Sequence, residues 1–533
     1  MSLNTNMHPL YQYEDISAYL DFIKDQTYAG RALSEQIAEL QYLYMEESQP
    51  WIVAFSGGKD STAILTLMFF ALLGLSPVQR KNKVYVVFCD TLAEVPIYLK
   101  KTLRTIKAVQ RTADLLGLPI ETKIITPKTQ DTFWSRLLGR GYPAPNLRLN
   151  RWCTEKIKLN PFKHFAETQF TDNESPIVMI GSRSAESANR QAILEKYHSS
   201  ESYFDDTDPS YRRYAPIKDW NVNEVWHVLG QRIAPGQYDD MEPWESPWGT
   251  SNIGLVELYD STNSTSGECP LVETASSPGC GKSRFGCWTC TVVTKDKAID
   301  GLIANGETWL EPLAKFRNFL HSTTEPSVKK LYRQDRRRDG KVSVKHGLQE
   351  EKDVEFIQGP YFLHLRKEWL AHLLNMEKDL NLAGHEVSLI TEDELHEIRY
   401  QWRNDPLTPD WADDLPTIYT SVYGDGKISF PKDDVSNFGE LEANIIDLLA
   451  EQHNTSPDLV RKLIELEVSL SGLVKRQGLY QRIDKILAQD WGSVEEAKSK
   501  RENEKAINFA LTQDLIDIDA ELDGISAMLN KEF

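Results

Sequence analysis

A short apolar run followed by a loop of serine and glycine constrains this chain more than any other feature. Residues 51–55 are apolar with a β-branched centre, as is typical of a buried strand. The loop at 56–61 has the sequence Ser-Gly-Gly-Lys-Asp-Ser, and residues 62–73 have the composition of a helix packed on a sheet. Glycines at such a junction let the backbone approach an anion, and the N–H groups that begin a helix favour phosphate. The predicted phosphate-binding residues are Ser56, Gly57, Gly58, Lys59, Asp60, Ser61 and Thr62.

The loop lacks the G-x-x-x-x-G-K-[ST] spacing of a Walker A motif. An ordinary tight turn is the alternative, although Ser-Gly-Gly-Lys-Asp-Ser is far more restrictive than a glycine pair. The stretch resembles the S-G-G-x-D-S pyrophosphate loop of the adenine nucleotide α-hydrolase group, also called PP-loop ATP pyrophosphatases. This resemblance implies ATP and Mg²⁺ as ligands, with Lys59 and Asp60 in catalytic roles.

Further apolar runs at 83–88, 120–125 and 176–180 alternate with helical patterns, of which 96–116 is the longest. Strands that alternate with helices predict an α/β fold, with a parallel twisted sheet and helices on both faces. Ligands of such sheets bind beyond the carboxyl ends of the strands. The sequence therefore places the phosphate loop at the same edge as the residues that follow strands 83–88 and 176–180.

Polar residues follow two of these strands. Asp90 could accept a hydrogen bond from adenine or ribose, or help to hold Mg²⁺; the alternative is a cap for the next helix. After residue 180, Gly181 precedes Arg183, and Arg183 and Arg190 could bind a phosphate or sulfonate while Glu186 orients them. The alternative for this second segment is a surface turn with an exposed ion pair.

A basic segment at 148–161 surrounds one cysteine. Neighbouring basic residues, among them Arg151 and Lys156, lower the pKa of a thiol and favour the nucleophilic thiolate, so Cys153 is a candidate catalytic residue. A buried, inert cysteine is the alternative, and the basic residues are the better anion-binding candidates. Taken in order, the segments at 90–94, 151–158, 181–190 and 215–226 resemble the phosphoadenylyl-sulfate (PAPS) reductase branch of the PP-loop group over about residues 50–230.

Four cysteines follow in one short stretch, and they are Cys269, Cys280, Cys287 and Cys290. Four thiolates this close in sequence suit a [4Fe–4S] cluster or a structural Zn²⁺, although only one C-x₂-C pair is present. Reductases of the branch that carry a cluster have a cysteine pair near the position of Cys153. Because Thr154 breaks that pair here, we expect the four later cysteines to be the ligands and Cys153 to be free for another role.

Length and charge bound the organisation of the chain. The 533 residues are too many for one core, and we expect a helical element at 1–49, a nucleotide-binding domain at 50–235, a loop-rich cysteine-cluster region at 236–300 and a helical region at 301–533 for DNA or partner contacts. The net charge of −19 argues against uniform non-specific binding to nucleic acid. The absence of a long apolar run or a signal pattern predicts a cytoplasmic protein without membrane contact.

The combination of these features resembles the DndC sulfurtransferase family of bacterial DNA phosphorothioation. That resemblance implies ATP-dependent activation of a DNA phosphate and insertion of sulfur from a cysteine desulfurase, with other phosphorothioation subunits as partners. The basic stretch 327–346 is a candidate DNA contact or a solvated helix face. The alternatives are a PAPS or APS (sulfonucleotide) reductase and a non-catalytic nucleotide-binding subunit.

Overall fold

The structure is a computed structural model, and it describes twelve stretches of the chain. They are residues 26–146, 151–170, 175–184, 204, 211–230, 246–261, 286–344, 356–405, 407–431, 439–470, 476 and 478–507. The chain divides into two compact units. Unit 1 lies within residues 1–133, 144–322 and 379–391, and unit 2 lies within residues 134–143, 323–378 and 392–533.

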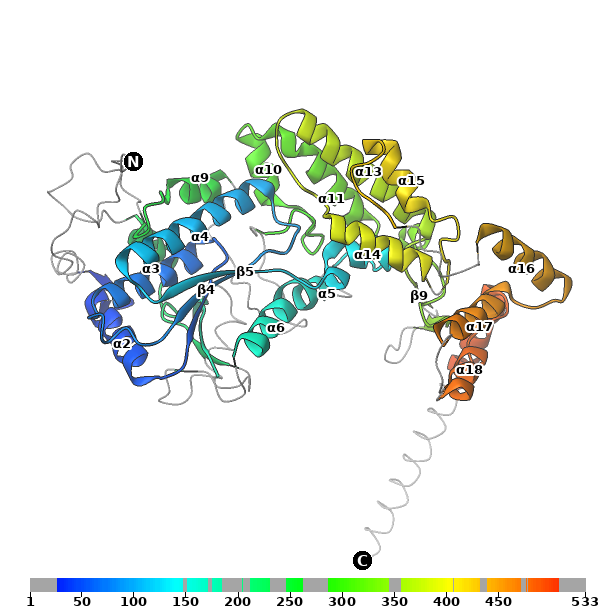
Figure 1. Ribbon diagram of the computed structural model, residues 1–533, viewed down its shortest axis with the longest axis horizontal. Coiled ribbons are helices and arrows are strands. Elements are labelled where there is room, and N and C mark those ends of the chain that lie inside the picture. Colours follow the sequence, from blue (N-terminus) through cyan, green and yellow to red (C-terminus); the bar gives the residue numbers. More distant parts are fainter. Residues whose placement is uncertain are drawn as a thin grey trace, which may run out of the picture. The chain divides into compact units, whose positions relative to one another are not determined.

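Unit 1 is built on a five-stranded parallel sheet (Figure 1). Its strand order is β5-β4-β3-β6-β7, so β3 is central and the chain moves outward from it in both directions. The pairing is in register, with Trp51 of β3 opposite Val84 of β4 and Ile177 of β6. The strands are β3 (Trp51–Ala54), β4 (Val84–Cys89), β5 (Ile120–Ile125), β6 (Ile177–Met179) and β7 (Arg212–Tyr214).

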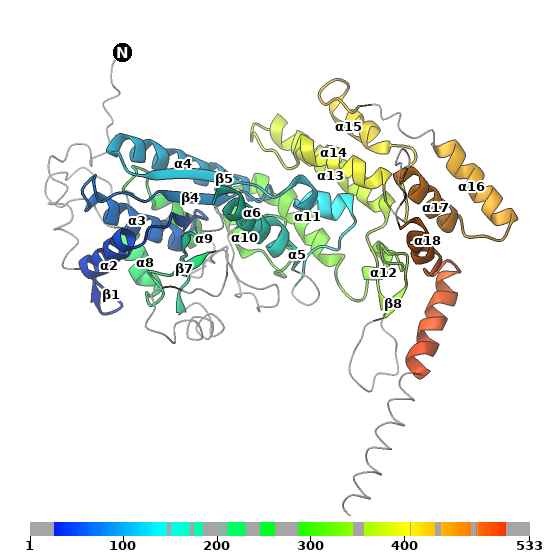
Figure 2. The same ribbon diagram turned by 60° about the horizontal axis from the view of Figure 1, so that its bottom comes forward.

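Helices cover both faces of this sheet, because alternate residues of its buried strands point to opposite sides. Val53 and Val86 pack with α3 and α4 in one core, while Ile52 and Val87 pack with Phe162 of α6 in another. Figure 1 shows α3 and α4 on one side of the strands and α6 on the other, and Figure 2 gives a second view of the same helices. The helices that contribute to these cores are α2 (Leu33–Glu46), α3 (Lys59–Leu73), α4 (Pro96–Leu116), α6 (Asn160–Gln169), α8 (Val222–Leu229) and α9 (Ile253–Ser261).

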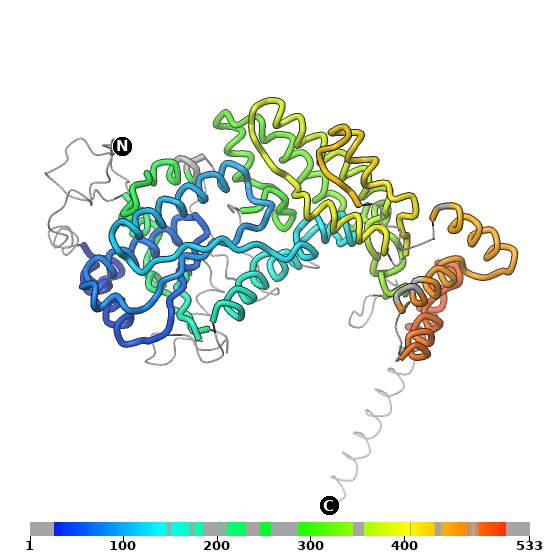
Figure 3. Tube along the Cα trace, in the orientation of Figure 1, coloured from blue at the N-terminus to red at the C-terminus, as the bar shows by residue number. Residues whose placement is uncertain are grey.

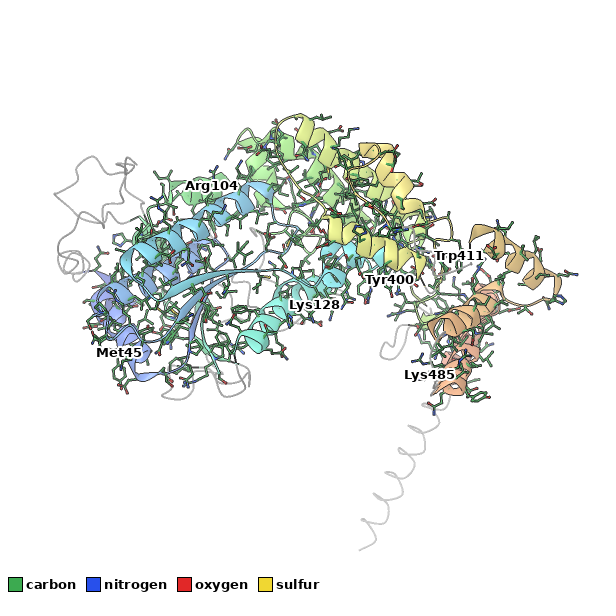
Figure 4. All side chains as sticks on the ribbon, in the orientation of Figure 1. Met45, Arg104, Lys128, Tyr400, Trp411 and Lys485 are labelled. Carbon is green, nitrogen blue, oxygen red and sulfur yellow. The ribbon has the colours of Figure 1, made fainter. Side chains whose placement is uncertain are left out.

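Shorter elements complete unit 1. A hairpin of β1 (Thr27–Tyr28) and β2 (Arg31–Ala32) precedes α2, and its turn has positive φ at Ala29 and Gly30. Side chains fill the space between the helices and the sheet in Figure 4, where Met45 marks the end of α2 and Arg104 marks α4. The remaining elements are η2 (Thr129–Asp131), α5 (Trp152–Thr154), η4 (Glu155–Leu159), α10 (Lys297–Ala304), η6 (Thr308–Leu310) and α11 (Glu311–Ser322).

Unit 2 is mostly helical. Buried Arg366 joins its segments, since it donates to the carbonyl of Gly139 at 2.6 Å and to Asp405 at 2.9 Å. Its elements are η3 (Ser135–Gly139), α12 (Lys329–Tyr332), β8 (Ser343–Val344), β9 (Phe356–Ile357), α14 (Glu392–Arg403), α15 (Asp414–Tyr423), α16 (Glu440–Gln452), α17 (Pro457–Ser469) and α18 (Leu479–Leu487). The long helix α13 (Leu363–Leu382) begins in unit 2.

The predicted α/β class is confirmed, with a parallel sheet, helices on both faces and a mostly helical C-terminal region. The fifth strand, β7, is not among the four strands that the sequence predicts. Its sequence Arg-Arg-Tyr has no apolar run, which is why the pattern did not indicate a strand. Within the described part of the chain, every helix is too short or too polar to cross a lipid bilayer.

Candidate functional site

The phosphate loop joins the central strand β3 to helix α3. Gly57 has a φ of +77°, which side-chain-bearing residues rarely adopt, and Gly58 is extended and precedes the first helical residue, Lys59. A Cβ on Gly57 would lie 2.4 Å from Oγ1 of Thr102. Both the backbone angle and the neighbouring side chain therefore require glycine at position 57.

The amides of this loop donate to hydroxyl oxygens through long hydrogen bonds. The N–H of Ser56 donates to Oγ of Ser61 at 3.2 Å, that of Gly58 to Oγ of Ser56 at 3.4 Å, and that of Lys59 to Oη of Tyr259 at 3.4 Å. Bonds of 2.7–3.2 Å are usual for N–H donors. Because these contacts are weak and the helix dipole adds positive potential, an anionic oxygen could replace the hydroxyls at low cost.

Three charged side chains form a buried ion-pair group behind the loop. Nζ of Lys59 lies 2.8 Å from Oδ2 of Asp60, and Nε of Arg183 lies 2.7 Å from Oδ1 of the same carboxylate. All three side chains are nearly inaccessible to solvent. Gly181 permits this arrangement, because a Cβ there would lie 3.0 Å from the backbone of Asp60. Asp60 thus links the start of α3 to the segment that follows β6.

Replacing Gly57 by alanine tests the loop geometry. We expect Gly57→Ala to lower the free energy of unfolding by about 1–3 kcal/mol more than Gly117→Ala, because only the first substitution overlaps a neighbour. Gly117 also has a positive φ, of +60°, but no atom lies within 4 Å of its Cβ position. Chemical denaturation measures both, and calorimetric titration should show weaker ATP binding for Gly57→Ala alone. Equal ATP affinities in the two variants would contradict the loop assignment.

A second group of polar side chains lies around the cysteine pair Cys287 and Cys290. Residues 93–95 form two backbone hydrogen bonds with residues 286–288. The N–H of Val95 donates to the carbonyl of Gly286 at 3.1 Å, and the N–H of Trp288 donates to the carbonyl of Ala93 at 2.9 Å. These bonds place Cys287 beside Glu94.

The hydroxyl of Thr91 connects the side chains of this group. It donates to Oε1 of Glu94 at 2.9 Å and lies 3.3 Å from Sγ of Cys287. Burial raises the pKa of the Glu94 carboxyl and also the pKa of the Cys287 thiol.

One pocket in unit 1 contains both the phosphate loop and the cysteines. Its volume is about 140 Å³, several times the roughly 30 Å³ that one water molecule takes in the liquid. The polar residues that line it include Ser56, Cys89, Glu94, Tyr98, Arg151, Cys153, Thr154, Lys158, Tyr259, Cys287, Thr289, Cys290, Thr291 and Asp296. Residues of the predicted phosphate loop and several cysteine thiols thus line the same pocket.

Part of the basic segment lines this pocket. Arg151 and Cys153 line it, whereas Lys156 forms an ion pair with Glu155 at 2.7 Å and is absent from the lining. Lys158, two residues further on in η4, lines the pocket instead. Cys89 also lines it, and burial raises the pKa of its thiol to about 12.

The side chain of Asp90 accepts a hydrogen bond within the turn that follows β4. Its Oδ1 accepts from the N–H of Leu92 at 2.9 Å, and burial raises the pKa of its carboxyl. It does not cap α4, whose preceding residue is Val95. The Asp90 carboxylate lies at the carboxyl-end edge of the sheet, as predicted. One of its two oxygens accepts the hydrogen bond from Leu92 in the local turn. Glu186 and Arg190 lie outside the described residues.

Arg317 of α11 holds the segment that begins at Cys290. This buried guanidinium donates to the carbonyl of Cys290 at 2.6 Å, to that of Thr294 at 3.0 Å and also to that of Val293. Burial lowers the pKa of Arg317. Three backbone carbonyls next to the cysteine pair therefore depend on a single side chain.

Replacing Arg317 by methionine should lower the free energy of unfolding by about 3 kcal/mol or more, because buried carbonyls lose their donors. Lys315→Met is the control on the same helix, since Lys315 is exposed and its ion pair with exposed Glu311 should contribute less than about 1 kcal/mol. Chemical denaturation measures both variants. Equal losses would show that the carbonyl contacts of Arg317 do not stabilise the segment.

Two of the four predicted cluster ligands can be placed. Cys287 and Cys290 line the pocket together with Cys153, while Cys269 and Cys280 lie outside the described residues. Among the residues that the structure describes, no three His, Cys, Asp or Glu side chains converge on one metal position. The two described thiols have the residue type and the enclosed setting that a cluster needs, and metal would replace their protons.

Sequence reasoning did not identify Tyr259 as a site residue. It lies on α9, within a stretch expected to be irregular, and no motif marks it. Its hydroxyl accepts from the N–H of Lys59, and Nζ of Lys59 lies 5.1 Å from the centre of its ring. The adjacent Trp226 contacts the tyrosine ring edge-on at 5.2 Å, which fixes the ring over the loop.

Part of this chain is similar in sequence to known proteins. Residues 50–237 match the family model of the phosphoadenosine phosphosulfate reductase domain. An uncharacterised protein of Methanocaldococcus jannaschii is 32% identical over 199 residues, which make up 37% of this chain and 35% of that protein. The chain thus matches about a third of the length of this relative. Residues 50–237 are thus similar to a PAPS reductase domain.

Proposed function

We propose that this protein is an ATP-dependent sulfurtransferase that inserts sulfur into the phosphate backbone of DNA. The observation that carries the proposal is the shared pocket, in which Ser56 and Gly58 of the phosphate loop face the same space as Cys153, Cys287 and Cys290. A nucleotide loop alone suits many reactions. Thiols beside it suit a reaction in which an activated phosphorus meets a sulfur nucleophile.

The first step activates the DNA. A non-bridging oxygen of a DNA phosphate attacks the α-phosphorus of ATP, the bond from that phosphorus to the bridging oxygen breaks, and pyrophosphate leaves with the electron pair. The loop amides and Lys59 stabilise the charge on the leaving group. Mg²⁺, when bound, would share that charge.

The second step brings in sulfur. A sulfur nucleophile forms a bond to the DNA phosphorus and displaces AMP. A persulfide on Cys153, formed by a cysteine desulfurase, is one such nucleophile; a thiol reductant then breaks its S–S bond and restores the cysteine. A [4Fe–4S] cluster held by Cys269, Cys280, Cys287 and Cys290 would offer sulfide as the other source.

The basic stretch at 327–346 gives this proposal less support than its sequence suggests. Arg333 donates to the carbonyls of Gln358 and Gly359, and Arg336 donates to those of Asp490 and Gly492. Arg338 likewise donates to the carbonyl of Arg140 at 2.9 Å. Three arginines of the stretch are thus structural, and Arg337 is the exposed one. DNA and the other phosphorothioation subunits remain proposed partners on chemical grounds.

Anaerobic purification followed by iron and sulfide analysis and a pyrophosphate-release assay tests the proposal. We expect about four irons per chain and pyrophosphate release from ATP that increases with added DNA. Phosphorothioate should then be detected in the DNA when a desulfurase and cysteine are supplied. Tight binding of PAPS without release from ATP would favour a sulfonucleotide reductase, and ATP binding without turnover would favour a non-catalytic subunit.

A further inference from the structure

Helix α16 (Glu440–Gln452) of unit 2 exposes its large apolar side chains. Leu441, Ile445, Leu448 and Leu449 are 69%, 46%, 68% and 49% exposed. Among the described residues, fifteen large apolar side chains are exposed, and four of them lie on this one helix. Scattered exposed leucines are normal, but a concentration of this kind marks an interaction site.

The four side chains form one stripe, because Ile445 is four residues from Leu441 and three and four residues from Leu448 and Leu449. The residues that α16 buries are small, Ala443 at 3% and Ala450 at 4% exposure. The helix packs against α17 (Pro457–Ser469), and the chain can be followed through both in Figure 3. This reverses the usual pattern, in which the large apolar residues of a helix face the core.

The charged residues of α16 itself are all negative. The sequence of α16 contains four acidic residues and no lysine or arginine. Glu442 lies on one side of the stripe and Glu451 on the other, according to their helical positions. Glu451 is exposed to solvent. A partner that buries the stripe must therefore approach between two acidic borders.

These charges determine which kind of partner can bind the stripe on α16. A second copy of α16 would bring acidic borders against acidic borders, which is unfavourable. Residues 508–533 of the chain contain six acidic residues and one lysine, so acidic side chains would again lie against the acidic borders of the stripe. DNA is a polyanion and is excluded by the same argument.

We propose that α16 docks an amphipathic helix of another protein, whose apolar stripe is bordered by lysine and arginine. The leucine stripe supplies the area that is removed from water, and the acidic borders supply orientation and selectivity. This surface is independent of the nucleotide pocket and of the sulfur chemistry proposed above.

Two synthetic helical peptides with the same leucine stripe serve as probes, one bordered by lysine and the other by glutamate. Fluorescence anisotropy measures their binding to the full chain. We expect the lysine peptide to bind about tenfold more tightly than the glutamate peptide. Substituting glutamine at positions 441, 445, 448 and 449 should weaken its binding at least about tenfold, since hot-spot side chains dominate such contacts.

Matched variants separate the stripe from general effects of charge and folding. Glutamine at Leu115, Leu331, Leu382 and Leu487, which are exposed elsewhere, should leave binding unchanged. Glu442→Gln with Glu451→Gln should reduce the salt dependence of binding while the stripe stays intact. Equal binding of the lysine peptide to wild type and to the stripe variant would overturn the proposal.

The other occupants have distinct signatures. Sedimentation that shows a dimer lost in the stripe variant would identify a second copy. Faster hydrogen exchange of residues 508–533 in that variant would identify the chain's own end, and loss of duplex DNA binding would identify DNA. Any of these results would also overturn the proposal.

Discussion

Replacing Asp60 by alanine is expected to lower the free energy of unfolding by about 3–5 kcal/mol, because one buried carboxylate contacts two buried cations. Its removal leaves Lys59 and Arg183 facing each other without the negative charge between them. The start of α3 and the segment after β6 should separate as a result. Denaturant unfolding measures the loss.

Glu121→Ala is the control for this prediction, because Glu121 also lies between two lysines, Lys83 and Lys123. That group is exposed, with 37% of the Glu121 side chain accessible, so the expected loss is below about 1 kcal/mol. Comparable losses in the two variants would mean that burial does not strengthen the group at Asp60.

Replacing Lys59 by methionine is expected to reduce pyrophosphate release about 10²–10³-fold, the usual effect of removing a group that stabilises developing charge. Methionine keeps most of the length of the side chain, and Asp60 keeps its contact with Arg183 at 2.7 Å. The loss of stability should therefore be smaller than in Asp60→Ala. A steady-state assay of pyrophosphate release separates the loss of turnover from the loss of folding.

Lys156→Met is the matched control for that experiment, since Lys156 lies outside the phosphate loop and pairs with exposed Glu155, whereas Lys59 pairs with buried Asp60. It should release pyrophosphate at nearly the wild-type rate. Near-normal release by Lys59→Met would exclude the phosphate loop as the site of ATP cleavage, whatever the control shows.

The sequence was sufficient to predict the sheet because its strands are short β-branched runs between helical patterns. The predicted runs at 51–55, 83–88, 120–125 and 176–180 each contain a strand of the sheet. Three polar or aromatic residues form β7, and they lack any such run. That strand exists because backbone pairing with β6 holds it, a contact that no local pattern encodes.

The candidate site was only partly predictable, since its geometry depends on contacts between distant segments. Lys59 and Asp60 belong to a recognisable motif, yet their pairing with each other and with Arg183 is visible only in the fold. Cys287 meets Glu94 through a bridge across almost two hundred residues. The sequence likewise did not show that three arginines of the basic stretch donate to backbone carbonyls, because charge in a sequence does not reveal which carbonyls a guanidinium will bind.

The attachment of the cysteine segment to residues 93–95 is made by main-chain atoms. The bonds from Val95 to Gly286 and from Trp288 to Ala93 do not involve any cysteine side chain. Exchange of the thiol at Cys287 should consequently leave the segment anchored in place. Variants of Cys287 can therefore test the role of the thiol in the reaction separately from its role in folding. A point mutation can also give the segment a different reactive side chain while its backbone keeps the same position.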